Sequence, residues 1–407
     1  MVKYSLEEVE KALYKPSTYG PDVDLGLYTG DSVKTNEISG GDEIPVEARK
    51  AGERFGINVE SAMYIQVDES ALYRSLERAL GKYGVKIMPT RLALEKSDLG
   101  REVSWRLIDP RSDKYTASAY LHGGEVGYFI YVPRGVRVPV PIYTCLAITS
   151  NRRIQYAHNI VFVDEGAEAH VVTGCAVPHG VREGVHIGIS EFYVSRNARL
   201  TFTMMHAWAE GMHIRPRTAV RVEEGGEYVS YYIIYSPVAS LQTYPRVELS
   251  TGARAYLASI IAGSGNGIYD QGSAAILQGK NSSAEVVSRA VASGYSEIYA
   301  RGSIEAFEAE SKGHIECLGL LISENAVISS IPMITSRKPG AILTHEAAIG
   351  MIAEKEIQYL MSKGFTEDEA KSVLVRGFMS IKVPGIPLTV KREVERLLDR
   401  ITRSAFG

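Results

Sequence analysis

Short polar turns that recur at a regular spacing constrain the fold of this chain more than any other feature of its sequence. The turns fall at residues 164–166, 196–198, 223–225, 250–252 and 279–281. Between them, β-branched and aromatic residues alternate with polar ones, which is the pattern of short strands. A repeat of roughly 27 to 32 residues predicts stacked structural units rather than a sandwich of two sheets.

Each unit would hold two or three short strands, and stacking would bury their inward side chains in one continuous core. A parallel β-helix fits this pattern. A β-propeller is the alternative at this period, but the sequence lacks the blade signatures of propellers. We therefore expect a mainly β protein whose parallel β-helix occupies residues 116–343.

The N-terminal region, residues 1–115, mixes helix and loop signals. Helices are expected at residues 44–56 and 69–84, and a long surface loop at residues 20–43, where Gly, Asp and Pro are scattered. This region would flank the β-helix on one side.

The C-terminal region, residues 344–407, is expected to be a helical domain. A helix is predicted from Thr344 because four apolar residues recur at helical spacing: Ile349, Ile352, Ile357 and Leu360. Gly364 would end this helix, Thr366 would cap the next, and a third helix would run through residues 388–401. Such an appendix covers the open end of a solenoid and offers a docking surface.

Charge and hydropathy exclude several classes of protein. The chain carries 45 basic and 48 acidic residues, for a net charge of −3, so it lacks the basic footprint of a nucleic-acid binder. No apolar run approaches the roughly 18 residues of a membrane helix, and the start MVKYSLEEVEKAL has no signal-peptide core. We therefore expect a cytoplasmic protein with neither nucleic-acid nor membrane partners.

Three cysteines, Cys145, Cys175 and Cys317, are too few for a disulfide framework and are expected to be free thiols. Cys145 looks buried and inert. Cys175 follows a predicted strand, and Cys317 should share one strand face with Ile315 and Gly319. A lone strand cysteine is most often structural, whereas binding sulfur or a soft metal requires the thiolate.

Two adjacent residues, His345 and Glu346, are expected at the junction between the last β coil and the first C-terminal helix. Glu346 can simply be an acidic residue in the first turn of a helix, where acids are favoured, with His345 as its neighbour. Alternatively, the two residues can present a nitrogen and a carboxylate as ligands, and the sequence leaves both possibilities open. Neither a P-loop nor an HExxH motif occurs, and the glycine run at residues 263–267 is predicted to be a solenoid turn.

The run LTHEAAIGMIAEKEIQYLMSKGFTEDEAKSVLVRGFM resembles the C-terminal signature of the SufB/SufD family of iron–sulfur cluster assembly proteins. The segments YVPRGVRVPVPI, VFVDEGAEAHVVTGCAVP and HIECLGLLISENA resemble the same family in order, so the resemblance covers about residues 120 to 385. It implies a right-handed parallel β-helix with an N-terminal α/β region and a C-terminal helical domain.

The resemblance also implies roles for four residues. Cys317 falls where the scaffold subunit SufB has the cysteine proposed to hold the nascent cluster, and Glu346 on the glutamate proposed to assist it. Cys175 matches the cysteine thought to receive sulfur, and His345 a histidine near the dimer interface. The set is closer to SufB than to SufD.

Two positions depart from the pattern of bacterial scaffolds. An arginine and a lysine associated there with the sulfur route appear here as His158 and Thr243. The resemblance therefore extends to the assembly site but not to these two residues of the sulfur route.

The implied function is that of a scaffold, not an enzyme, which builds a transient iron–sulfur cluster at a dimer interface and transfers it to apo-proteins. The implied partners are a second copy of the chain or a SufB/SufD paralogue, a sulfur donor, and a SufC-type ATPase on the C-terminal helices. This chain itself would bind no nucleotide, and the use of reduced flavin stays open. The alternatives are a SufD-like subunit that binds no cluster and a carbohydrate-active β-helix enzyme.

Overall fold

A computed structural model describes residues 4–28, 64–68, 70–73, 80–123, 126–381 and 392 of the 407-residue chain. The helix expected at residues 44–56 lies outside the described residues. So does the third C-terminal helix expected at 388–401, apart from residue 392.

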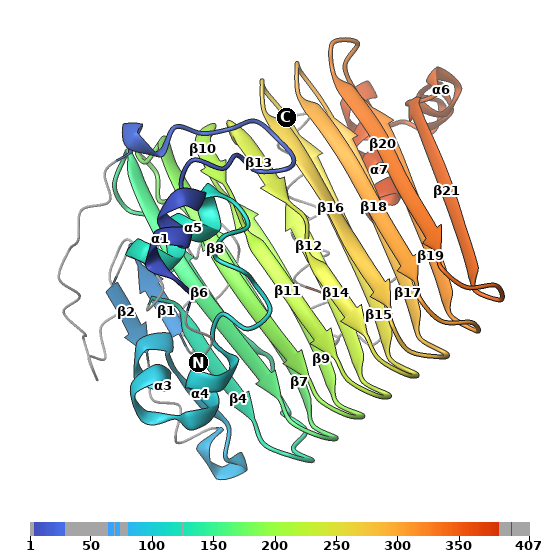
Figure 1. Cartoon of the computed structure of the whole chain (residues 1–407). Helices are drawn as coiled ribbons and strands as arrows, with labels where there is room; N and C mark the ends of the chain where they lie inside the picture. The colour runs from blue at the N-terminus through green and yellow to red at the C-terminus, as the bar shows by residue number, and fades with distance from the viewer. Residues whose placement is uncertain are drawn as a thin grey trace.

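One long sheet of ten strands runs the length of the described part of the molecule (Figure 1). All of its neighbouring strands are parallel except β1 and β2. In spatial order its strands are β2 (Ser70–Tyr73), β1 (Tyr64–Val67), β5 (Ile142–Ala147), β7 (Glu168–Ala176), β9 (Arg199–Ala207), β12 (Glu227–Ile234), β15 (Arg254–Gly263), β17 (Ser283–Ala292), β19 (Lys312–Leu321) and β21 (Ile342–Met351).

A second sheet of eleven strands lies against the first, and the chain passes from one sheet to the other and back in each coil. The result is a parallel β-helix of about 8 coils, as the sequence predicts. The strands of the second sheet are β3 (Lys86–Pro89), β4 (Tyr128–Val132), β6 (Arg153–Val163), β8 (Glu183–Val194), β10 (Gly211–Ile214), β11 (Arg217–Val222), β13 (Ser240–Thr243), β14 (Arg246–Leu249), β16 (Ile268–Leu277), β18 (Glu297–Ala306) and β20 (Val327–Ser336).

The regular turn spacing of the sequence is confirmed as the coil length. Arg254 lies opposite Ser283, and Ser283 opposite Lys312, so each coil here takes 29 residues. The recurring turns place a left-handed residue at equivalent points, for example Gly225 at φ 67° and Asn281 at φ 55°. Glycine and asparagine tolerate this conformation, which explains the similar composition of the turns.

The space between the two sheets is the main hydrophobic core, and it continues from coil to coil. Buried apolar residues of both sheets meet there, including Val163, Leu200, Leu257 and Ile304. Other segments cover part of the outer face of each sheet: the N-terminal region packs on the eleven-stranded sheet, and α7 (Glu367–Met379) on the ten-stranded sheet. Functional side chains can therefore point either into the core or to an outer face.

The N-terminal region is helical in part, but two expectations for it are wrong. The helix expected at residues 69–84 is replaced at its start by β2, and the strand pattern expected from residue 116 begins only with β4. A capping box between Asp113 and Thr116 instead starts a helix, α5. The helices that the structure describes in this region are α1 (Leu6–Ala12), η1 (Leu25–Leu27), η4 (Gly81–Tyr83), α3 (Thr90–Lys96), α4 (Asp98–Val103) and α5 (Lys114–His122).

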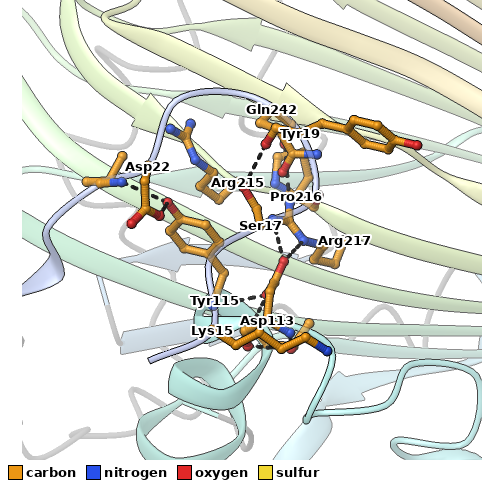
Figure 2. A network of polar contacts seen from close by, with 12 residues as sticks. Lys15, Ser17, Tyr19, Asp22, Asp113, Tyr115, Arg215, Pro216, Arg217 and Gln242 are labelled. Carbon is orange, nitrogen blue, oxygen red and sulfur yellow. Dashed lines mark hydrogen bonds and ion pairs between the residues drawn. The ribbon is translucent and has the colours of Figure 1, made fainter. Parts of the chain in front are cut away.

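Two arginines anchor the N-terminal region on the outer face of the eleven-stranded sheet (Figure 2). Arg217 donates to the Asp113 carboxylate, Nε–Oδ2 2.8 Å, and so holds the start of α5. The buried Arg215 donates to the carbonyl of Pro21, Nη2–O 2.8 Å. The Tyr115 hydroxyl accepts from the backbone of Val23 at 3.0 Å. These contacts make the N-terminal segment part of the folded unit.

The prediction that a helix starts at Thr344 is wrong. β21 extends to Met351, and α6 (Glu354–Ser362) begins only after it. Pairing with β19 along all ten residues overrides the local helical pattern. The expected cap at Thr366 is confirmed, since its hydroxyl accepts from the backbone of Glu369 at the start of α7 (Glu367–Met379). The division of the chain into three domains stays a prediction.

Candidate functional site

Cys317 points into the core near one end of the β-helix. Ile315, Cys317 and Gly319 share one face of β19, as the sequence predicts, and the alternating burial of the strand shows that this is the inner face. Cys317 is in register with Ser288 of β17 and Ala347 of β21. Burial raises the pKa of its thiol, an effect that the nearby Ser330 hydroxyl opposes. The thiol is therefore protonated near neutral pH unless a ligand or reaction removes the proton.

His345 and Glu346 lie inside β21 and not at a helix start, which corrects the expectation from the sequence. His345 is in register with Ile315 and so occupies the inner side of the strand, next to the coil that carries Cys317. Glu346 is in register with Glu316 on the outer side. Both side chains are exposed because β21 is the last strand of its sheet. A single chain thus brings His345 toward Cys317 but not Glu346.

The outer side of this end carries two further charged residues that the sequence analysis did not single out. Glu316 forms an ion pair with Arg289 of the preceding coil, and both are largely buried. Glu346 therefore projects beside an existing Arg–Glu pair. The coil length of 29 to 30 residues is the signal that relates these positions, but it becomes usable only once the register is known.

Cys175 also points into the core, several coils away. It lies on β7, is fully buried, and belongs to the main core cluster. Its thiol donates to the Met204 sulfur, Sγ–Sδ 3.7 Å, and it is in register with His206. Burial raises the pKa of Cys175 well above its ordinary value, with the nearby Cys145 adding to the rise.

A row of inward-facing side chains leads from the neighbourhood of Cys175 to Cys317. Starting at Met204, consecutive members are in register across four coil steps, which at the strand spacing amounts to about 19 Å. The row consists of Met204, Tyr232, Ser259, Ser288 and Cys317. After Met204, every member carries a hydroxyl or a thiol, which is unusual in a solenoid core.

Hydrogen bonding along this row is incomplete. Gln271 donates to the Ser288 hydroxyl, Nε2–Oγ 2.9 Å. The Tyr232 hydroxyl is buried and has no hydrogen-bond partner among the described residues. A buried hydroxyl without a partner is costly, and here it leaves one unpartnered polar group on the row between the two thiols.

His206 extends the polar interior next to Cys175. Trp208 donates to His206, Nε1–Nδ1 2.9 Å, so the proton of a neutral His206 lies on Nε2. That nitrogen is buried without a partner in the described part of the chain. Burial lowers the pKa of His206 well below its usual range, which keeps the ring neutral. Nothing in the sequence distinguishes this histidine from the other eight.

The two departures from bacterial scaffolds lie on different faces. His158 is outside the core, with Nε2 2.8 Å from the Glu191 carboxylate and its ring against Trp105. That carboxylate also accepts the backbone N–H of Trp105, so the pair anchors the N-terminal region. Thr243 faces the core in register with Gln271. Of the two, only Thr243 therefore adjoins the polar interior.

Cys145 is buried, as expected, and burial raises the pKa of its thiol to about 12. Within the described ranges, no three His, Cys, Asp or Glu side chains gather closely enough to hold a metal ion. None of the helices in those ranges is both long and apolar enough to span a membrane.

The structure is a parallel β-helix with the thiols of Cys175 and Cys317 on its inner face and a row of mostly polar side chains between them. The comparisons identify the family to which this β-helix belongs. The family model described as "SUF system FeS cluster assembly, SufBD core domain" matches residues 146–378, which include Cys175, Cys317, His345 and Glu346. The chain belongs to the SufBD family of iron–sulfur cluster assembly proteins.

Relatives named "Iron-sulfur cluster assembly SufBD family protein" match over most of the chain. One from Methanothermobacter thermautotrophicus is 38% identical over 408 residues, which covers 98% of each protein. One from Archaeoglobus fulgidus is 40% identical over 357 residues, covering 87% of this chain and 94% of the relative. One from Staphylococcus epidermidis is 28% identical and covers 90% of this chain and 80% of the relative. The family resemblance inferred from the sequence is confirmed.

Proposed function

We propose that this chain is a scaffold on which a labile iron–sulfur cluster is built between two protein chains and then transferred to apo-proteins. The observation that carries the proposal is the position of Cys317. It lies one strand from the open end of the β-helix, with His345 and Glu346 on the terminal strand itself. A second chain docked on that end would add its own ligands to those of the first.

The open end has the character of an interface. Among the described residues, β21 is the last strand of its sheet and β20 pairs only with β18, so each has one edge without a paired strand there. Apolar side chains are exposed on these two strands: Val327, Ile331, Met333, Ile334, Ile342, Ile349 and Met351. Edges and patches of this kind favour association, here with a second copy of the chain or with a SufB/SufD paralogue.

The chemistry of the three residues suits transient binding. Thiolate and imidazole are good ligands for iron–sulfur clusters, whereas a carboxylate is a weaker ligand that can release the product. The Cys317 thiol must lose its proton to bind iron. Because burial raises its pKa, the strength of the iron–sulfur bond depends on how readily that proton is released. Glu346 points outward in one chain and would serve a site shared with its partner.

A sulfur donor would transfer one sulfur atom to the Cys175 thiol as a persulfide. A two-electron reductant would then restore the thiol and release the sulfur as sulfide, which would pass along the inward row to Cys317. The contact with Met204 and the hydroxyls of Tyr232, Ser259 and Ser288 support this route. A lysine is not needed on this path, because Thr243 and Gln271 line it with uncharged polar groups.

The energy for rearrangement would come from a SufC-type ATPase docked on α6 and α7. Apolar side chains on these helices and on the turn between them are exposed, namely Tyr359, Met361, Phe365 and Val373. The work would take place in the reducing cytoplasm, where free thiols persist. Reduced flavin would be one source of electrons for this assembly.

The test is to co-express the chain with its ATPase partner without oxygen and to measure the visible spectrum, iron and sulfide of the purified complex. The wild type is expected to be coloured, and Cys317→Ala to be colourless. Cys145→Ala removes a thiol of equal burial and should keep the colour. If the wild-type complex is colourless but stable, the chain is instead a SufD-like subunit that binds no cluster. Full cluster content in both Cys317→Ala and Glu346→Ala would refute the assigned site.

A further inference from the structure

A groove of about 520 Å³ crosses the outer face of the ten-stranded sheet near the first residues of β12, β15, β17, β19 and β21. It lies on the face opposite to the interior thiols. Its volume falls within the range of small-molecule sites, roughly 300 to 1,000 Å³. Charged and polar side chains of consecutive coils line it, so its chemistry can be followed along rows of residues in register.

The first row shows a break in an alternating pattern of charge. Its members, in register from coil to coil, are Glu168, Arg199, Glu227, Arg254, Ser283, Lys312 and Ile342. Acid and base alternate as far as Arg254, and Arg199 pairs with Glu227 at 3.4 Å. The next position should then be acidic, but it holds Ser283, and Lys312 follows.

Two cations therefore flank a hydroxyl with no acid between them. Neither Arg254 nor Lys312 forms an ion pair with another residue in the described part of the chain, and both are exposed. They lie two strands apart, about 10 Å at the strand spacing. An anion placed over Ser283 would contact both cations and accept a hydrogen bond from the hydroxyl.

A second row beside the first provides room and hydrogen-bonding groups for a larger molecule. It consists of Tyr256, Glu285, His314 and Thr344, again in register. The His314 ring and the Thr344 hydroxyl are already paired, Nδ1–Oγ1 2.8 Å. Tyr256 offers a half-buried ring, and the Glu285 carboxylate accepts hydrogen bonds but repels a second anion. A ligand that fits both rows has one anionic end and an uncharged body with hydrogen-bond donors.

We propose that this groove binds a small organic phosphate, with its phosphate group over Ser283 between Arg254 and Lys312 and its body along Tyr256 and His314. Arginine forms paired hydrogen bonds with phosphate oxygens, and lysine supplies a compact charge. This proposal is independent of cluster assembly, because it requires neither the interior thiols nor a partner chain.

The test uses inorganic phosphate as the probe of the anionic end. Isothermal titration calorimetry at constant ionic strength is expected to show saturable binding to the wild-type chain. Two variants should each weaken that binding at least tenfold. Lys312→Gln removes one of the two cations, and Ser283→Asp introduces a carboxylate at the position where the alternating pattern lacks one. Asn266→Asp adds the same charge in an exposed turn at the far end of β15 and should leave binding unchanged.

Acetate serves as a second probe and is expected to bind more weakly than phosphate. Acetate binding as tight as that of phosphate would overturn the phosphate assignment. Absence of saturable phosphate binding, or equal binding by wild type and Ser283→Asp, would overturn the site itself. Thermal unfolding gives an independent readout: in phosphate-free buffer Ser283→Asp should raise the Tm relative to Asn266→Asp, and a lower Tm would contradict the missing-acid argument.

Discussion

Strand alternation decides, residue by residue, which functional groups of this chain can meet. That Cys317 shares a strand face with Ile315 and Gly319 follows from the sequence alone, and the structure shows that this face is the inner one. The outward direction of Glu346 does not follow, because the surrounding residues favour a helix and parity has no meaning there. The row from Met204 to Cys317 also requires the register between coils, which a single sequence does not specify.

The thiol of Cys317 should react slowly and only at high pH in the absence of partners. Burial raises its pKa, so its alkylation rate should still be rising above the ordinary cysteine pKa of about 8.5. Mass spectrometry of iodoacetamide-treated protein over a pH series measures this. Cys145, whose pKa is about 12, should react more slowly still. A rate for Cys317 that levels off below the ordinary pKa would show that the thiolate is stabilised in the free chain.

Acid should destabilise the fold through its buried histidines. His186 lies in the interior with Nδ1 2.9 Å from the Gln155 amide oxygen, and burial lowers its pKa from 6.5 to about 4. The unfolded chain binds this proton first, so stability falls as pH drops from about 6.5 to about 4. A shift of this size corresponds to about 3 kcal/mol for full burial.

His186→Asn keeps a donor toward Gln155 but does not titrate. Urea unfolding at both ends of this pH window should therefore show a smaller loss of stability for His186→Asn than for the wild type. His122→Asn changes an exposed histidine and should behave as the wild type does. Equal pH dependence in wild type and His186→Asn would contradict the buried neutral state.

At the scale of elements, pairing and packing outweigh local preference at the C-terminal end. The residues of β21 include helix formers, yet they extend the sheet because β19 offers ten backbone partners in register. The helices α6 and α7 follow with the end signal at Gly364 and the cap at Thr366 that the sequence indicates. Helix caps depend on neighbouring residues and can therefore be predicted from the sequence. The addition of a strand to a sheet edge depends on distant residues and cannot.

The packing of α7 on the outer face of the ten-stranded sheet should depend on Met379. This side chain is fully buried with Val375 in a cluster that includes Val291 of β17. Met379→Ala should reduce the free energy that holds α7 on the sheet by about 2–5 kcal/mol. Hydrogen exchange should then show reduced protection in α7 with β9 and β12 unchanged. Val373→Ala, at an exposed position of the same helix, should have little effect, and equal protection in both variants would contradict this docking.

The terminal strands β20 and β21 should control self-association. Met333 is exposed on β20, and Met333→Lys places a charge on the proposed interface. Sedimentation velocity should show the wild type as a dimer and Met333→Lys shifted toward monomer. Tyr14→Lys alters an even more exposed side chain in the N-terminal region and should leave the dimer intact. A wild type that is monomeric at all concentrations, or a dimer unaffected by Met333→Lys, would exclude this end as the interface.

At the scale of the whole molecule, the β-helix could be predicted because its turns recur in the sequence at the length of one coil. Gly166, Gly225 and Gly252 occupy left-handed positions that recur once per coil, and this period distinguishes a solenoid from other β folds. The attachment of the N-terminal region to the β-helix could not be predicted from the sequence. It depends on Arg215 and Arg217, whose partners lie about 100 or more residues earlier in the chain. Contacts of that sequence separation leave no periodic signal.

The central claim is that one cluster is built by two chains around Cys317, and native mass spectrometry of the anaerobically purified complex tests it most directly. A single spectrum gives the number of chains together with the bound iron and sulfide. We expect two copies of the chain to carry the cluster mass, and the Cys317→Ala complex to have the same chain number without it. A cluster on a single chain, or an undiminished cluster mass in Cys317→Ala, would contradict the account.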